Sequence, residues 1–140
     1  MYQTLILIGT LGNDPEMRYM QNGQAVTNFS LAVNRKWTNK QTGERQEEVT
    51  WYRVSVWGRQ AEAVHEYLGK GRQVMVEGRL RPDPKTGGPR LWTRQDGTIG
   101  ASFEVTANDV KFLGSNGQEN GNGYSNGYSV PAQEEDDIPF

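Results

Sequence analysis

Hydrophobic and polar residues alternate along several short stretches of this chain, and alternation with a period of two is the pattern of β-strands. The clearest stretch is 48–57, which also contains two tryptophans. Because successive side chains point to opposite faces of a strand, one face carries Tyr52, Val54 and Val56, and the other carries Trp51, Arg53, Ser55 and Trp57. The same pattern predicts further strands over residues 3–9, 26–35 and 72–80, and a last strand at the end of 90–106.

Helical spacing replaces this alternation in one segment, residues 60–68, where an apolar stripe is formed by Ala61, Val64 and Leu68. The predicted order is therefore five strands with one helix between the third and the fourth. This is the order of the all-β OB-fold, a five-stranded Greek-key barrel that binds oligonucleotides or oligosaccharides. Small barrels of other kinds share similar orders, so the order by itself leaves those barrels open.

Two segments between these elements are predicted to be loops. Residues 38–47 are polar, contain a glycine, and predict a long mobile loop, and residues 82–89 contain three prolines and two glycines. The dipeptide Asp96-Gly97 predicts the turn of a hairpin arm within residues 90–106.

The composition changes sharply near residue 115. Residues 1–114 have the composition of a globular domain, and we assign the OB-fold to them. Residues 115–133 consist mainly of Asn, Gly, Ser and Tyr, which cannot bury enough apolar surface to offset the entropy of ordering, so a disordered linker is expected. Residues 134–140 form a distinct acidic tip with the sequence EEDDIPF.

The charge divides at the same position. Residues 1–114 hold all 15 lysines and arginines and 12 acids, a net charge of +3, whereas the rest of the chain holds five acids and no base. A mildly basic domain tied to an acidic tail indicates a polyanionic partner for the domain. A solvated surface with a solubilising tail is the alternative, and this net charge alone does not decide between the two.

The sequence shows no grouping of residues that would predict an assembled catalytic or metal site. The chain has no cysteine, so disulfides and thiolate metal sites are excluded. The single histidine, His65, has no second ligand nearby, and the acidic residues are not grouped, although they leave a nuclease-type metal site open. We expect no enzyme activity, no cofactor and no metal. Without a secretion signal or a membrane span, the expected location is cytoplasmic.

Each of the four tryptophans has a cation within three residues. Stacking on an aromatic ring is tolerant of base sequence, and Arg or Lys neutralises the phosphates between stacked bases. Tryptophan is also often a core residue, which is the alternative for any one of them. Four together, with two on the face opposite an apolar one, favour a surface for single-stranded nucleic acid. The candidates are Trp37 with Arg35 and Lys40, Trp51 and Trp57 with Arg53 and Arg59, and Trp92 with Arg90.

These motifs together resemble the bacterial single-stranded DNA-binding protein family. The resemblance rests on Leu11-Gly12-Asn13-Asp14-Pro15-Glu16 with Arg18-Tyr19-Met20, on Trp51-Tyr52-Arg53-Val54 through Trp57-Gly58-Arg59, on Val76-Glu77-Gly78-Arg79-Leu80-Arg81, and on the last five residues. The resemblance implies an OB-fold in a homotetramer around which DNA wraps, in the cytoplasm with the nucleoid. It also implies that the four tryptophans stack bases and that the cationic contacts are Arg18, Lys40, Arg53, Arg59, Lys70, Arg81 and Arg90.

The acidic tip is similar to the docking peptide through which this family recruits replication, recombination and repair proteins. Four consecutive acids and two apolar anchors around a proline suit a basic pocket with a hydrophobic floor. The partner-binding residues implied by the resemblance are Asp136, Asp137, Ile138, Pro139 and Phe140.

The chain departs from the family pattern at the arm and near a subunit interface. Aligning Trp92 requires extra residues, about the segment 82–91, and Tyr52 stands where the family often has His. These departures concern tetramer geometry and the DNA footprint. The function predicted from the sequence is sequence-independent binding and protection of single-stranded DNA. An OB domain for RNA or oligosaccharide, a nuclease, and a purely structural role are the competing interpretations.

Overall fold

The computed structural model describes residues 1–115, so the predicted acidic tip and all but the first residue of the predicted linker lie outside the described residues. Seven strands and one helix occur in this part of the chain. The predicted strand 72–80 is confirmed residue for residue, and the predicted helix 60–68 is displaced by one residue. The elements are β1 (Leu5–Leu11), β2 (Glu16–Tyr19), β3 (Ala25–Thr38), β4 (Arg45–Trp57), α1 (Arg59–Tyr67), β5 (Arg72–Leu80), β6 (Arg90–Thr93) and β7 (Ile99–Ser115).

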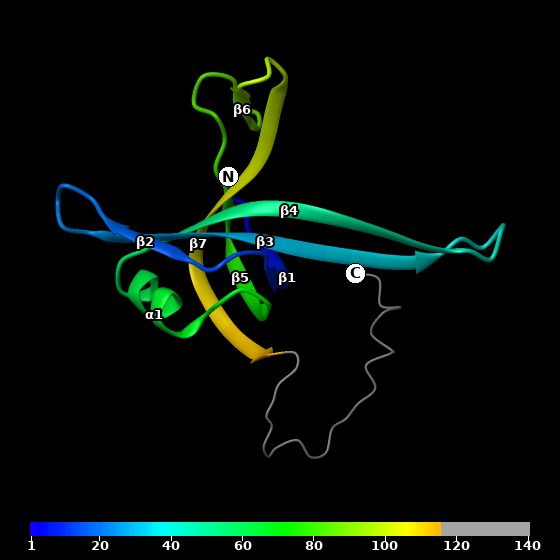
Figure 1. Cartoon of the computed structure of the whole chain (residues 1–140), viewed down its shortest axis with the longest axis horizontal. Coiled ribbons are helices and arrows are strands. Elements are labelled where there is room, and N and C mark those ends of the chain that lie inside the picture. Colours follow the sequence, from blue (N-terminus) through cyan, green and yellow to red (C-terminus); the bar gives the residue numbers. More distant parts are fainter. Residues whose placement is uncertain (116–140) are drawn as a thin grey trace.

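Five of the strands close into a barrel in the order β1-β5-β7-β4-β3. The pairs Thr10↔Ala32 and Leu11↔Leu31 join β1 back to β3, and β4 and β7 form the parallel pair. The short helix α1 lies between β4 and β5 along the chain and at one end of the barrel in Figure 1. The predicted OB-fold is thereby confirmed.

The alternating residues of the predicted strands supply the core. Phe29 and Leu31 of β3 and Val54 and Val56 of β4 are each at most 2% exposed, and their neighbours in sequence face outward. Ala61, Val64 and Leu68 of the helix segment are buried as well. The two-residue alternation of β4 thus places its tryptophans on the outer face, as the sequence predicts.

Thr27 links the helix to the barrel wall. It is fully buried, and its hydroxyl donates a 2.7 Å hydrogen bond to the carbonyl oxygen of Ala61. A buried hydroxyl without a partner would be costly, so this bond lets a polar residue occupy the core side of β3.

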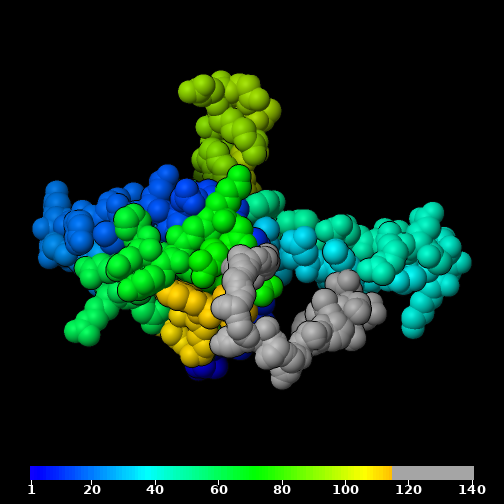
Figure 2. Space-filling view, turned by 60° about the horizontal axis from the view of Figure 1, so that its bottom comes forward, coloured from blue at the N-terminus to red at the C-terminus, as the bar shows by residue number. Residues whose placement is uncertain are grey.

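The predicted extent of the mobile loop, residues 38–47, is wrong, because most of the second half of this segment is strand. β3 continues to Thr38 and β4 begins at Arg45, and these two residues pair. The long β3/β4 hairpin projects far from the barrel in Figures 1 and 2. Its polar residues lack alternation because the projecting ribbon has no core-facing side, so the sequence shows no strand pattern there.

A second projection, which we call the arm, comprises residues 82–102. Its loop 82–89 is free of regular strand, as predicted, and β6 pairs with the start of β7. The Asp96-Gly97 turn is confirmed: Gly97 has φ +91°, and the Asp96 carboxylate accepts hydrogen bonds from the amide and hydroxyl of Thr98 at 2.9 and 2.7 Å. Within residues 1–115, no helix is long and apolar enough to cross a membrane.

Candidate nucleic-acid interface

A groove of about 810 Å³ opens on the outer face of the barrel, between the arm and the short strand β2. Its floor is the outer face of β4, with Arg53 opposite Ser30 of β3 on one side and opposite Glu104 of β7 on the other. Within the floor, the Ser55 hydroxyl donates a 2.6 Å hydrogen bond to the amide oxygen of Asn28. The groove is therefore built on strands of the barrel, which hold its side chains in fixed register.

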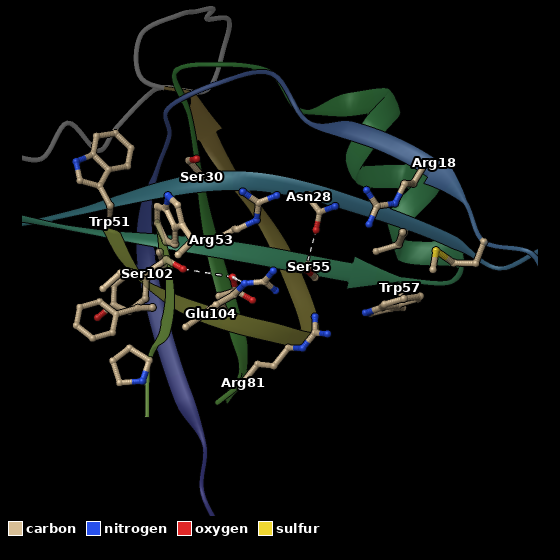
Figure 3. A pocket seen from close by; sticks show the side chains of 18 residues that line it. Arg18, Asn28, Ser30, Trp51, Arg53, Ser55, Trp57, Arg81, Ser102 and Glu104 are labelled. Atoms are coloured by element: carbon tan, nitrogen blue, oxygen red, sulfur yellow. Dashed lines mark hydrogen bonds and ion pairs between the residues drawn. The ribbon is translucent and has the colours of Figure 1, made fainter. Parts of the chain in front are cut away.

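Three of the four tryptophans line the groove: Trp51, Trp57 and Trp92. Trp51 is 54% exposed and Trp92 is 43% exposed, so neither is a core residue. Figure 3 shows Trp51 and Trp57 at opposite ends of the β4 face. Six residue steps along the strand separate them, which corresponds to about 20 Å. The Trp51 ring lies against the backbone of Gly12, since a Cβ built there would meet a ring carbon at 2.6 Å.

Four arginines from four different parts of the chain meet in this groove. Arg18 comes from β2, Arg53 from β4, Arg81 from the end of β5, and Arg90 from the arm. Figure 3 shows Arg53 between Trp51 and Trp57, with Arg18 and Arg81 on opposite sides of β4 nearer Trp57. Arginine presents a planar fork of donors suited to phosphate oxygens, and a groove lined by one sign of charge concentrates anions.

One carboxylate lies among these arginines. Glu104 has a side chain that is 14% exposed, with its Oε2 4.0 Å from Nε of Arg90 and 3.3 Å from the donating hydroxyl of Ser102. Its backbone oxygen accepts a 2.7 Å hydrogen bond from the amide of Arg81. Glu104 thus connects the arm to the barrel wall, while the lining keeps an excess of positive charge.

Five of the twelve predicted DNA-contacting residues do not line the groove. Trp37 lies on the β3/β4 hairpin, where the guanidinium carbon of Arg35 is 4.4 Å from its ring centroid. Arg35 also pairs with Glu48 at 3.6 Å. The others are Lys40 in the hairpin turn, Arg59 at the start of α1 and Lys70 after it. The structure brings together the remaining seven: Arg18, Trp51, Arg53, Trp57, Arg81, Arg90 and Trp92.

Several lining residues were missed from the sequence. Asn28 and Ser30 follow from the alternation of 26–35, because they face away from Phe29 and Leu31, so a signal for them was present. Met20, Ser102 and Glu104 had no local signal, because their position depends on how distant strands close the barrel.

No group of three or more metal-ligating side chains occurs in the described part of the chain. The pKa values of Asp96 and Asp109 are lowered, and neither residue lines the groove. The pKa of Asp96 is lowered chiefly by the Thr98 hydroxyl, and the pKa of Asp109 is lowered chiefly by hydrogen bonding to Lys111.

A closed five-stranded barrel with an aromatic and cationic groove on the outer face of its strands defines an OB-fold ligand-binding domain. The chain belongs to the single-strand binding protein family, whose family model matches residues 2–113. A solved structure described as a Plasmodium falciparum SSB complex with ssDNA is similar, with 28% identity, a TM-score of 0.64, and coverage of 81% of this chain and 96% of that one. The small single-stranded DNA-binding protein from Streptomyces coelicolor shares the fold, with 20% identity, a TM-score of 0.65, and coverage of 79% and 94%.

Proposed function

We propose that this protein binds single-stranded DNA without sequence preference and protects it during replication, recombination and repair. The observation that carries the proposal is the groove that is lined by three exposed or partly exposed indoles together with four arginines. Every base has a π-face, so stacking on these rings does not select a sequence, and each stack contributes roughly 1–3 kcal/mol. The arginines neutralise the phosphates that connect the stacked bases.

The geometry favours a single strand over a duplex. Duplex bases are already stacked on one another, and an indole reaches their faces only after they separate. Membership of the single-strand binding family and the likeness to the Plasmodium protein, which is described as a complex with ssDNA, support the same ligand.

The four arginines that line the groove make a neutral sugar a poor ligand for it. Stacking also serves oligosaccharides, but four guanidinium groups in one groove match a chain that carries a charge at every unit. RNA shares this chemistry, because stacking and phosphate contacts do not read the 2′-hydroxyl. A competition with RNA is therefore part of the test below.

Two further parts of the proposal rest on the sequence. We propose that the tip Asp136–Phe140 docks replication, recombination and repair proteins, because consecutive acids followed by apolar anchors suit a basic pocket with a hydrophobic floor. We also propose that the chain assembles as a homotetramer, as its family resemblance implies. Sedimentation of the full chain would show a mass near that of the monomer if this assembly is wrong.

The decisive experiment is a titration of the full chain with thymidine oligonucleotides, monitored by tryptophan fluorescence at several salt concentrations. We expect strong quenching and poor competition by duplex of equal length. The logarithm of the binding constant should fall by about 0.7 per neutralised phosphate for each tenfold increase in salt concentration. Arg53→Ala should reduce that slope, whereas Lys85→Ala, on the arm but outside the groove lining, should not. Absent quenching would refute stacking, and equal competition by RNA would remove the restriction to DNA.

A further inference from the structure

On the arm, Trp92 and Gly100 are direct cross-strand partners. Gly100 is buried, although every residue from Leu91 to Ile99 and also Ala101 is exposed. A Cβ built on Gly100 would lie 2.7 Å from both Cε2 and Cζ2 of the Trp92 ring. The indole therefore rests on the bare backbone of the opposite strand and occupies the space that any side chain at position 100 would need.

Arg94 borders the same ring. Its guanidinium carbon lies 5.9 Å from the Trp92 ring centroid, and its Nη2 would be 3.0 Å from the Cβ built on Gly100. Its Nη1 donates hydrogen bonds to the Thr98 hydroxyl at 3.2 Å and to the carbonyl oxygen of Ile99 at 3.1 Å. The guanidinium is thus fixed to the turn of the arm and limits the movement of the indole beside it.

We propose that Gly100 is a positioning residue for Trp92: its missing side chain forms a seat that, with Arg94, holds the indole in its groove-lining orientation before DNA binds. This inference rests on the proposed function, in which Trp92 stacks a base. A tryptophan on a two-stranded arm has few neighbours to restrict its rotamers, and a ring ordered in advance loses less entropy on binding. The 43% of Trp92 that remains exposed is the part available to a base.

The same contact also has a purely structural interpretation, because an aromatic ring across from a strand glycine stabilises a hairpin by covering it. The two interpretations differ in what Gly100→Ala does when Trp92 is absent. If Gly100 acts on DNA binding through the indole, the substitution has no effect on affinity in a Trp92→Ala background, and the two changes are strongly non-additive.

The experiment measures binding of a labelled thymidine oligonucleotide by fluorescence anisotropy for the full chain and for Gly100→Ala, Trp92→Ala and the double variant. The matched control is Gly88→Ala on the same arm, where the nearest atom to an added Cβ is the Thr86 hydroxyl at 3.6 Å. We expect a loss of about tenfold for Trp92→Ala, within the range that one base stack contributes, and a loss of about threefold to tenfold for Gly100→Ala, which leaves the indole present but displaced. The double variant should match Trp92→Ala, and the control should stay within about twofold of wild type.

A second readout reports on the indole itself. The near-ultraviolet circular dichroism of the DNA-free protein should change in Gly100→Ala and not in Gly88→Ala, with melting temperatures that confirm folding. If Trp92→Ala leaves affinity unchanged, the stacking role of Trp92 in the proposed function is wrong. Two results would refute the seat while the proposed function stands, provided that Trp92→Ala weakens binding. In the first, the affinity of Gly100→Ala stays within about twofold of wild type. In the second, the double variant binds more weakly than Trp92→Ala alone.

Discussion

Glu104 and Arg90 form the ion pair that joins the arm to the barrel, with Oε2 and Nε 4.0 Å apart. The two side chains are unequally exposed, at 14% for Glu104 and 61% for Arg90. The pair therefore places a nearly buried negative charge in a groove that we propose for a polyanion. Glu104 directs Arg90 toward the lining, and at the same time it opposes the phosphates that Arg90 would neutralise.

Replacing Glu104 by Gln should raise the affinity for single-stranded DNA at low salt by about threefold, a gain typical of one weakly screened charge interaction. Gln keeps the size of the side chain and an oxygen that accepts from Ser102, so the change removes mainly the charge. Binding isotherms at low and high salt measure the effect, and the gain should shrink as salt is added. A fall in affinity at every salt concentration would show that holding the arm outweighs the repulsion.

The position of Trp37 outside the groove predicts a dependence on oligonucleotide length. Trp57→Ala should weaken binding of short and long thymidine oligonucleotides alike, by roughly 1–3 kcal/mol for the lost stack. Trp37→Ala should weaken only long ones, because its indole lies on the projecting β3/β4 hairpin. A length series for both variants, measured by anisotropy, provides the test. Equal losses on the shortest oligonucleotides that bind would contradict the separation.

The sequence predicted the groove floor because a strand that is buried on one side repeats every two residues. Val54 and Val56 pack inward, and this alone places Trp51, Arg53 and Trp57 together on the outside. The pattern fails where neither side of a ribbon is buried. That is why the end of β3 and the start of β4, at Thr38 and Arg45, were predicted to be loop.

The closing of the groove could not be predicted, because it depends on contacts between residues distant in the sequence. Arg18 reaches the groove on β2, a four-residue strand that was not predicted. Glu104 has no special neighbours in sequence, and its significance appears only once β7 lies parallel to β4 beside Arg53. Gly100 likewise reads as an ordinary strand glycine until Trp92 is placed across from it.

Thr27→Val tests the link between the helix and the barrel. The substitution removes the hydroxyl donor, while the carbonyl oxygen of Ala61 still accepts a hydrogen bond within α1, so the expected cost is the net contribution of one hydrogen bond, about 0.5–1.5 kcal/mol. We expect a lower free energy of unfolding in urea with little change in the slope of the transition. DNA affinity should be unchanged under conditions where the variant is folded, because neither residue lines the groove. An unchanged urea midpoint would show that the bond contributes nothing.

The turn of the arm should respond to acid through Asp96. Hydrogen bonds from the Thr98 hydroxyl and amide hold the pKa of Asp96 below its ordinary value of 3.8. A carboxyl group whose pKa is lower in the folded protein stabilises the fold above its ordinary pKa, and this contribution is lost as the pH falls through the lowered value. The turn should therefore stay intact through pH 4 and loosen only below it. Titration of the Thr98 amide by nuclear magnetic resonance measures this, with Asp96→Asn as the control that keeps an acceptor but has no charge to titrate. A midpoint at or above 3.8 in the wild type would contradict the stabilisation of the carboxylate by Thr98.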